Sequence, residues 1–213
     1  MTRSFHLPKK DILSKTSPSD PMEWYFKPFF RFAYRKRLAL ALDLLGGNHE
    51  KLLEVGHASG ILLPELSRRC NELHAVDIHE NNSLVEKMLS LEKVDAQLKV
   101  GSILNLEYSN HNFDALICLS VLEFMKKDDL VNALKEIHRV TKTEGKIVLG
   151  FPKYSKISDL AFRIFGLKST DLYNCSYVDI EKAVRNEFPN IQISLWPSFP
   201  NNMSIYAICI CES

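Results

Sequence analysis

Two acidic residues and two glycines mark the part of the chain best suited to hold a small ligand. Glu54 and Gly56 end the apolar run KLLEVG, Gly60 closes the short loop HASG, and Asp77 follows seventeen residues later in HAVDIHE. A glycine loop between a strand and a helix presents backbone N–H groups at the positive end of that helix. Carboxylates beside such a loop suit a ligand that donates hydrogen bonds or carries positive charge. We therefore expect a ligand site at this loop.

The loop does not fit a dinucleotide-binding motif. The pattern G-x-G-x-x-G beginning at Gly56 requires glycine at two further positions, where the chain has Ala58 and Ile61. Glu54 would also place a carboxylate near an incoming pyrophosphate, which gains nothing from negative charge. A nicotinamide-dependent oxidoreductase is therefore the least favoured of the functions considered.

From residue 51 onward, short apolar runs alternate with stretches of helical spacing, such as DDLVNALKEIHRVTKTEG from residue 128. Repeated strand and helix units with near-continuous apolar strands predict a parallel sheet covered on both faces. Two last runs separated by FPNN predict a final antiparallel pair. The expected fold is therefore doubly wound α/β with a mostly parallel sheet. The expected strands cover residues 51–56, 72–78, 96–102, 113–120, 145–151, 191–198 and 203–213.

Composition and charge place the chain among ordinary globular proteins. Its 213 residues include 27 basic and 26 acidic side chains, a balance that does not predict a broad nucleic-acid-binding face. No apolar stretch is long enough to span a bilayer, and MTRSFHLPKK lacks the apolar core of a signal peptide, so we expect a cytoplasmic protein. Five cysteines without a CxxC pair predict reduced, mostly buried thiols and no metal site.

The ends of the strand-helix series differ in character from its middle. Residues 1–48 are expected to form an N-terminal helical cap or lid, because the stretch 19–47 is rich in aromatic and basic side chains and ends at a Gly-Gly break. Residues 49–213 are expected to form one compact ligand-binding domain. Within it the alternation lapses after Phe151, so residues 152–176 are expected to be an insertion on the substrate side.

Five motifs carry a resemblance to a known family. In this order and at these intervals, LLEVGHASG, HAVDIHE, VGSIL, FDALICLSVLEFM and GKIVLGFP resemble the motifs of class I S-adenosylmethionine-dependent methyltransferases, particularly the small-molecule and lipid-modifying branch. The resemblance covers roughly residues 50–151. It implies a Rossmann-like sheet of seven strands with the last strand antiparallel, S-adenosylmethionine as cofactor and S-adenosylhomocysteine as product.

The resemblance also implies roles for individual positions. Glu54 corresponds to the acid that orients the methionine portion of the cofactor, and residues 56–60 to the loop under its amino and carboxylate groups. Asp77 corresponds to the acid that binds both ribose hydroxyls, although an acid that only caps a loop or helix is the competing interpretation. Residues 102–103 correspond to adenine neighbours, and residues 119–120 end the fourth strand beside the methionine portion. The cofactor-binding positions carried over are Glu54, Gly56, His57, Ala58, Gly60, Asp77, Ile78, Ser102, Ile103 and Leu119.

Two of these positions depart from the family pattern, and His57 is an unusual neighbour in the loop. Ala58 stands where the family usually has glycine, and we expect it to be tolerated through a negative φ and a slightly altered loop. Ser102 stands where the family usually has an acid, and a hydroxyl accepts a hydrogen bond from the adenine amino group more weakly. His57 is expected to contribute a contact and no chemistry.

Methyl transfer needs alignment more than it needs acid–base groups, because the leaving group is already activated. A general base is required only if the acceptor must lose a proton during attack. His111, His138 and Tyr154 are candidate bases, but ordinary packing or surface roles are favoured for each. We assign no catalytic residue.

The acceptor is expected to be a small molecule or a lipid-like compound. Residues 22–37 combine aromatic and basic side chains, and three interpretations stay open. They form a cap helix with solvated charges, a lid over an apolar acceptor that rests on an anionic membrane surface, or, last in order, a binding surface for single-stranded RNA. For the whole chain, the alternative to methyl transfer is a non-catalytic protein that binds S-adenosylmethionine or S-adenosylhomocysteine.

Overall fold

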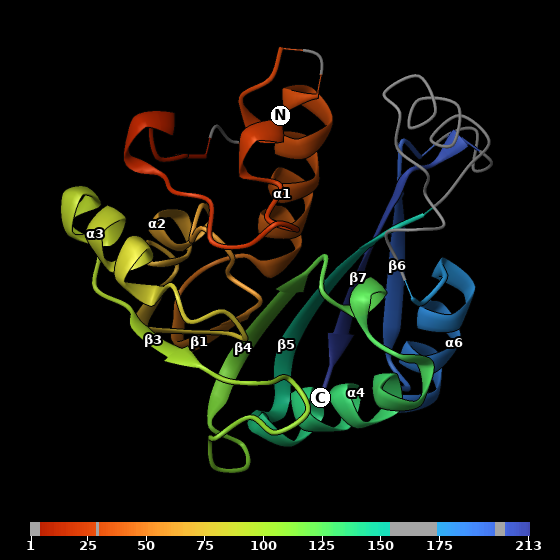
Figure 1. Ribbon diagram of the computed structural model, residues 1–213. Coiled ribbons are helices and arrows are strands. Elements are labelled where there is room, and N and C mark those ends of the chain that lie inside the picture. The colour runs from red at the N-terminus through yellow and green to blue at the C-terminus, as the bar shows by residue number, and fades with distance from the viewer. Residues whose placement is uncertain (1–4, 29, 154–173, 199–202) are drawn as a thin grey trace.

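The computed structural model describes residues 5–28, 30–153, 174–198 and 203–213, and a single seven-stranded sheet lies at its centre (Figure 1). The strand order is β3-β2-β1-β4-β5-β7-β6. Neighbouring strands from β3 to β5 pair in parallel, whereas β7 is antiparallel to both β5 and β6. This confirms the predicted doubly wound fold with an antiparallel last strand. The strands are β1 (His49–Val55), β2 (Cys70–Asp77), β3 (Gln97–Val100), β4 (Phe113–Leu119), β5 (Thr141–Pro152), β6 (Ile191–Trp196) and β7 (Tyr206–Glu212).

Helices cover both faces of this sheet. Figure 1 shows α1, α2 and α3 on one side and α4 and α6 on the other. The α-helices are α1 (Arg31–Leu45), α2 (Leu63–Leu66), α3 (Asn82–Glu92), α4 (Lys127–Val140) and α6 (Tyr177–Glu187), and the short 3-10 helices are η1 (Lys10–Ile12), η2 (Met22–Tyr25) and η3 (Leu122–Phe124). None of the helices in the described parts of the chain is both long and apolar enough to cross a membrane.

Successive residues of each strand enter different cores, as the pleat of a strand requires. On β1, Leu52 packs with α1, α2 and α3, whereas Leu53 packs with α4 and α6. Cys209 and Cys211 of β7 both lie in the core that includes α4 and α6, on one face of the sheet, as their spacing predicts. All five cysteines are free thiols and four are buried, which matches their predicted role as core residues. Both faces of the sheet are therefore closed by hydrophobic packing.

Two helices are shorter than the sequence pattern predicts. The amphipathic stretch 61–70 contains only the single turn α2, and α4 ends at Val140 although helical spacing continues beyond it. The chain passes from Val140 directly into β5, where Thr141 pairs with Phe113 of β4. A β-branched side chain favours this extended backbone over another helical turn.

The N-terminal part of the chain packs onto the sheet as well. Leu38, Leu42 and Leu45 of α1 are buried in the same core as β1, and α1 ends just before Gly46, at the predicted Gly-Gly break. The division into a cap at 1–48 and a domain at 49–213 stays a prediction. Most of the expected insertion at 152–176, including Tyr154, lies outside the described residues.

Candidate cofactor site

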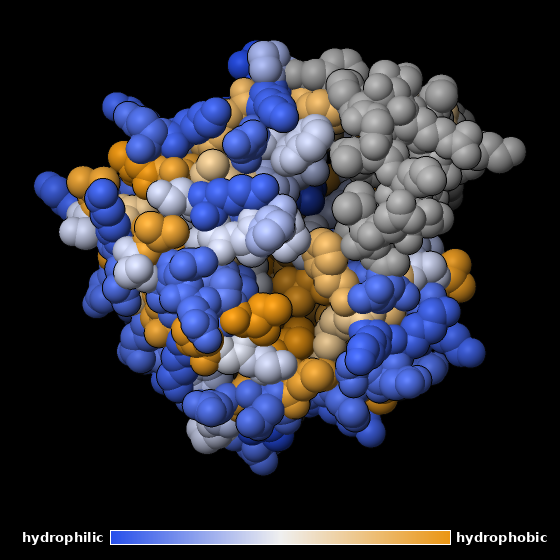
Figure 2. Space-filling view, in the orientation of Figure 1, coloured by the Kyte–Doolittle hydropathy of each residue, from blue (hydrophilic) through white to orange (hydrophobic). Residues whose placement is uncertain are grey.

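A cavity of about 540 Å³ lies at the carboxyl ends of β1, β2 and β4. This edge is where ligands bind in open α/β sheets. Figure 2 shows the molecule hollowed near the middle of this view, with hydrophobic side chains along the hollow. Of the predicted positions, Gly60 and Ser102 are not part of the cavity wall. The wall includes Glu54, Gly56, His57, Ala58, Asp77, Ile78, Ile103 and Leu119.

The two predicted glycines shape the loop that follows β1. Gly56 has φ +82°, and a Cβ added there would lie 2.2 Å from Cγ2 of Val121. Gly60 has φ +72°, and an added Cβ would lie 2.6 Å from Cγ1 of Val85 on α3. Both positions therefore require glycine for backbone conformation and for close packing. Gly60 itself is not part of the cavity wall.

Ala58 corrects one expectation, because its φ is +47° and not negative. Three hydrogen bonds hold this left-handed residue in place. Its N–H donates to Oδ2 of Asp77 at 2.8 Å, and its carbonyl oxygen lies 3.0 Å from Nδ1 of His57 and 2.9 Å from Nε2 of His79. The loop thus keeps the glycine-like conformation, and its neighbours stabilise it against the steric cost of the methyl group.

Asp77 connects the loop to the end of β2. Besides the bond from Ala58, its Oδ1 accepts the N–H of His79 at 3.2 Å. A carboxylate offers about four acceptor positions, so roughly two remain for a ligand at the cavity wall. The structure therefore gives Asp77 a loop-organising contact and leaves acceptor capacity free for its predicted role.

Glu54 is a buried carboxyl at the wall of the cavity. Its exposed fraction is 6%, and Oε2 has no hydrogen-bond partner among the described residues. Burial, and then the charge of Asp77, raises the pKa of Glu54 to about 8. A buried carboxyl without a donor is costly, so a ligand that supplies N–H groups here would be strongly favoured.

His57, Asp77 and His79 bring three potential metal ligands within 4.8 Å of one another. Their hydrogen bonds indicate a different use. Nδ1 of His79 accepts the N–H of Asn81 at 3.1 Å, so Nε2 carries the proton that it donates to Ala58. Burial lowers the pKa of His57. Both imidazoles share the carbonyl oxygen of Ala58 as a hydrogen-bond acceptor, and they therefore hold the loop in place.

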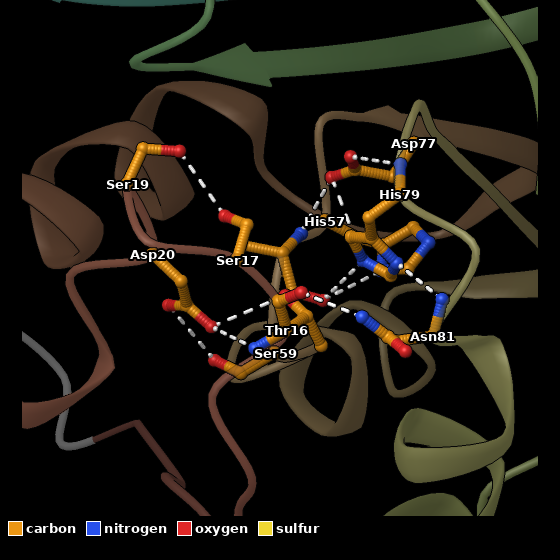
Figure 3. A network of polar contacts seen from close by, with 10 residues as sticks. Thr16, Ser17, Ser19, Asp20, His57, Ser59, Asp77, His79 and Asn81 are labelled. Atoms are coloured by element: carbon orange, nitrogen blue, oxygen red, sulfur yellow. Dashed lines mark hydrogen bonds and ion pairs between the residues drawn. The ribbon is translucent and has the colours of Figure 1, made fainter.

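An N-terminal segment, residues 16–20, makes polar contacts with residues of the loops after β1 and β2 (Figure 3). Asp20, 6% exposed, accepts hydrogen bonds from the N–H of Thr16 at 3.1 Å and of Met22 at 2.9 Å, and Oγ of Ser59 donates to it at 3.4 Å. Nδ2 of Asn81 donates to the carbonyl of Thr16 at 2.8 Å. The segment around Asp20 is therefore bonded to both loops that surround the cavity.

Ser102 serves the loop after β3. Its hydroxyl accepts the N–H of Leu104 at 3.2 Å, and its backbone pairs with Asn105. Its neighbours Gly101 and Ile103 line the cavity instead. The predicted contact between Ser102 and adenine stays a prediction.

The described base candidates are remote from the cavity wall. His111 precedes β4, at the amino-terminal ends of the strands, whereas the cavity lies at their carboxyl ends. Its Nδ1 lies 3.2 Å from the carbonyl oxygen of Thr141. His138 on α4 bonds Glu187 of α6 at 2.8 Å. Both have structural partners, in agreement with the ordinary roles expected for them.

Sequence patterns did not identify several wall residues from distant segments. His79 stands two residues after Asp77, and this short spacing was the only signal for it. Asp20, Tyr25 and Arg37 belong to the N-terminal region, where no motif pointed to the cavity. Only one of the three interpretations of residues 22–37 placed Arg37 among solvated charges, and the structure shows that its guanidinium bonds Ser120 at the end of β4.

Comparison with known proteins agrees with this geometry. Residues 53–149 match a family model described as a methyltransferase domain. No curated protein matches the chain significantly.

Solved structures share the fold at low sequence identity. The N-methyltransferase NodS from Bradyrhizobium japonicum, in complex with S-adenosyl-L-homocysteine, has a TM-score of 0.61 and 16% identity, with 93% of this chain and 94% of that chain covered. A possible histamine N-methyltransferase from Thermotoga maritima has a TM-score of 0.63 and 19% identity, with 89% and 92% covered. Phosphoethanolamine N-methyltransferase 2 from Haemonchus contortus, in complex with S-adenosyl-L-methionine, has a TM-score of 0.61 and 14% identity, with 84% and 52% covered. The family match shows a methyltransferase domain over residues 53–149, and the strand order and the glycine loop agree with the resemblance to class I S-adenosylmethionine-dependent methyltransferases.

Proposed function

We propose that the protein transfers a methyl group from S-adenosylmethionine to a small-molecule or lipid-like acceptor. The observation that carries this proposal is the pair of carboxyl side chains at adjacent strand ends. Glu54 and Asp77 both line the cavity, on either side of the loop from Gly56 to Gly60.

The donor set fits the cofactor. Oε2 of Glu54, which has no hydrogen-bond partner in the described parts of the chain, would accept an N–H of the ammonium group of the methionine portion. Asp77 retains acceptor positions for two vicinal hydroxyls, and the loop supplies backbone N–H groups for a carboxylate. When bound, the cofactor supplies an activated methyl group on a sulfonium.

The protein's own contribution is alignment and exclusion of water. Leu119, Val121, Phe124 and Met125 line the cavity at and beyond the end of β4, and their side chains make this part of the wall apolar. An apolar wall favours a small or lipid-like acceptor and keeps water from the reacting methyl group. We assign no general base, so the acceptor is proposed to present a nucleophile that needs little or no deprotonation.

The expected cap and the expected membrane contact are also part of this proposal. We propose residues 1–48 as a cap, supported by the bonds of Asp20 and Thr16 to the loops beside the cavity. Peripheral membrane contact through 22–37 stays a prediction, supported by Phe32, which is 69% exposed beside the exposed Arg31.

Calorimetric titration with S-adenosylhomocysteine tests the site. Asp77→Asn should weaken binding about 10- to 100-fold, because a hydrogen bond to a charged group contributes about 1.5–3 kcal/mol. Asp95→Asn, at an exposed loop position after α3, is the matched control and should bind like the wild type. Equal binding by the Asp77 variant and the wild type would remove Asp77 from the site.

A protein that holds the cofactor without turnover is the second candidate function. It is favoured by the positions of His111 and His138, which lie away from the cavity. Methyl-labelled S-adenosylmethionine, incubated with the protein and an extract of metabolites and lipids, separates the two functions. Transfer of label to any acceptor rejects the binding-only protein, whereas tight binding without transfer supports it.

A further inference from the structure

Arg37 occupies a cage of aromatic rings at the wall of the cavity. Its guanidinium carbon lies 4.4 Å from the ring centre of Tyr34, 5.3 Å from that of Tyr25 and 5.4 Å from that of Tyr206. Nη1 donates to Oγ of Ser120 at 3.1 Å, and Nη2 donates to the Tyr25 hydroxyl at 2.5 Å. The surrounding aromatic rings and two hydrogen-bond acceptors hold this cation in one position.

The guanidinium has donors left over. It carries five N–H groups, and the two bonds above use only two of them. Nε is buried and has no hydrogen-bond acceptor among the described residues. The hydrogen-bonding capacity of Arg37 therefore exceeds what its neighbours in the described chain satisfy.

The positive charge also lacks a close counterion among the described residues. No carboxylate of the described residues lies within 4.0 Å of the Arg37 nitrogens. Glu123 interacts with Arg37 from farther away, but burial raises the pKa of this carboxyl to about 8. Burial also raises the pKa values of Tyr34 and Tyr206, so both phenols stay neutral. A cation in such surroundings is costly unless an anion joins it.

The position of Arg37 limits which anion can join it. Arg37, Tyr25 and Ser120 all line the cavity, and Ser120 directly follows Leu119 at the end of β4. A planar guanidinium with parallel N–H groups matches the two oxygens of a carboxylate. We infer that Arg37, with Tyr25 and Ser120, forms a carboxylate subsite of this cavity. The inference rests on the proposed function, in which two molecules bring carboxylates here: the cofactor through its amino-acid portion, or an acidic acceptor.

Two pairs of probes separate these sources. S-adenosylhomocysteine carries the amino-acid carboxylate, whereas 5′-methylthioadenosine lacks the whole amino-acid portion. Benzoate carries a carboxylate, whereas benzyl alcohol is a neutral molecule of similar size. The first pair of probes is titrated calorimetrically into wild type, Arg37→Gln and Arg37→Lys. The second pair is titrated into the S-adenosylhomocysteine complexes of the same three proteins. Arg31→Gln is the matched control, because Arg31 is an exposed residue of the same helix.

If the subsite holds the cofactor, Arg37→Gln weakens the binding of S-adenosylhomocysteine about 30-fold or more. This is the loss typical of truncating one partner of a buried charge pair. Binding of 5′-methylthioadenosine stays within about twofold, which also shows that the variant is folded. If the subsite holds the acceptor, the wild-type complex prefers benzoate to benzyl alcohol, and Arg37→Gln loses that preference. Arg37→Lys keeps the charge without the fork and gives an intermediate loss in either case.

The inference is overturned if Arg37→Gln leaves the ratio of the two nucleoside affinities unchanged and the wild-type complex shows no preference for benzoate. Failure of the proposed function is a different result, in which the wild type binds neither nucleoside. The free wild-type chain is then titrated with benzoate and benzyl alcohol, and equal or absent binding overturns the subsite too. Should Arg37→Gln not fold, Arg37→Lys replaces it. The same two comparisons, between the two nucleosides and between benzoate and benzyl alcohol, then test the subsite.

Discussion

Replacing Ala58 by glycine tests whether the cofactor loop is held in a strained conformation. With φ +47°, Ala58 occupies the left-handed region, which costs a residue with a Cβ about 1–2 kcal/mol. Glycine avoids that cost but gains about 0.4–1 kcal/mol of conformational freedom in the unfolded chain. The difference predicts that Ala58→Gly raises the free energy of unfolding by about 0.5 kcal/mol, the opposite sign from an ordinary alanine-to-glycine change.

Urea unfolding at equilibrium measures this effect directly. Ala183→Gly is the matched control, because Ala183 lies within α6, where glycine should lower the free energy of unfolding by about 1 kcal/mol. Ala58→Val is a second comparison. A β-branched residue tolerates positive φ poorly, so this variant should be less stable than the wild type by more than about 1 kcal/mol.

Ligand binding provides an independent check on the same residue. The three hydrogen bonds of Ala58 use its N–H and its carbonyl oxygen, which glycine retains. Ala58→Gly should therefore bind S-adenosylhomocysteine within about threefold of the wild type. A loss of stability equal to that of Ala183→Gly, or a loop that no longer binds, would refute the view that Ala58 is strained and held by its neighbours.

Two further predictions concern Gly56 and Glu123, which lie near the cavity. Gly56→Ala should lower the free energy of unfolding by at least about 2 kcal/mol, because φ is +82° and the new Cβ would lie 2.2 Å from Cγ2 of Val121. Val121→Ala should restore part of that loss in urea unfolding, and no restoration would exclude the clash. Glu123 has its pKa raised to about 8 by burial, so the folded protein keeps a proton that the unfolded chain releases above its ordinary pKa. The contribution of the protonated Glu123 to stability is therefore lost as pH rises from about 5 to 8. Glu123→Gln should make the free energy of unfolding decline less steeply over this range of pH. An unchanged slope of the free energy of unfolding against pH would contradict the prediction.

The sheet was predictable because its central strands are buried on both faces. Near-continuous apolar runs such as KLLEVG reveal a strand without any knowledge of its neighbours. Helix ends were less predictable. The spacing beyond Val140 still fitted a helix, but pairing of Thr141 with β4 placed these residues in a strand. That choice depends on a long-range contact, which periodicity does not contain.

The candidate site likewise contains residues that local motifs predicted and residues that only long-range contacts place there. Glu54, Gly56 and Asp77 lie at strand ends and have fixed spacing, so the motif series placed them, and all three line the cavity. Arg37 is 83 residues from the serine that it bonds. Its sequence neighbours are basic and aromatic, and several of them are exposed, so nothing local distinguished it from a solvated charge. The left-handed conformation of Ala58 was missed for the same reason, since Asp77 and His79 stabilise it from another strand end.

These long-range bonds make the cofactor loop and the N-terminal segment parts of one network. The carbonyl of Ala58 is held by His79, the N–H of Asn81 bonds that same histidine, and the side chain of Asn81 bonds the carbonyl of Thr16. A displacement of the N-terminal segment would therefore remove support from the loop after β2, and through His79 from the strained residue of the cofactor loop. A residue in a sparsely populated conformation persists only while its surroundings hold it. The order of the cofactor loop is thus coupled to the docking of an N-terminal segment that the sequence alone predicted to be a cap or a lid.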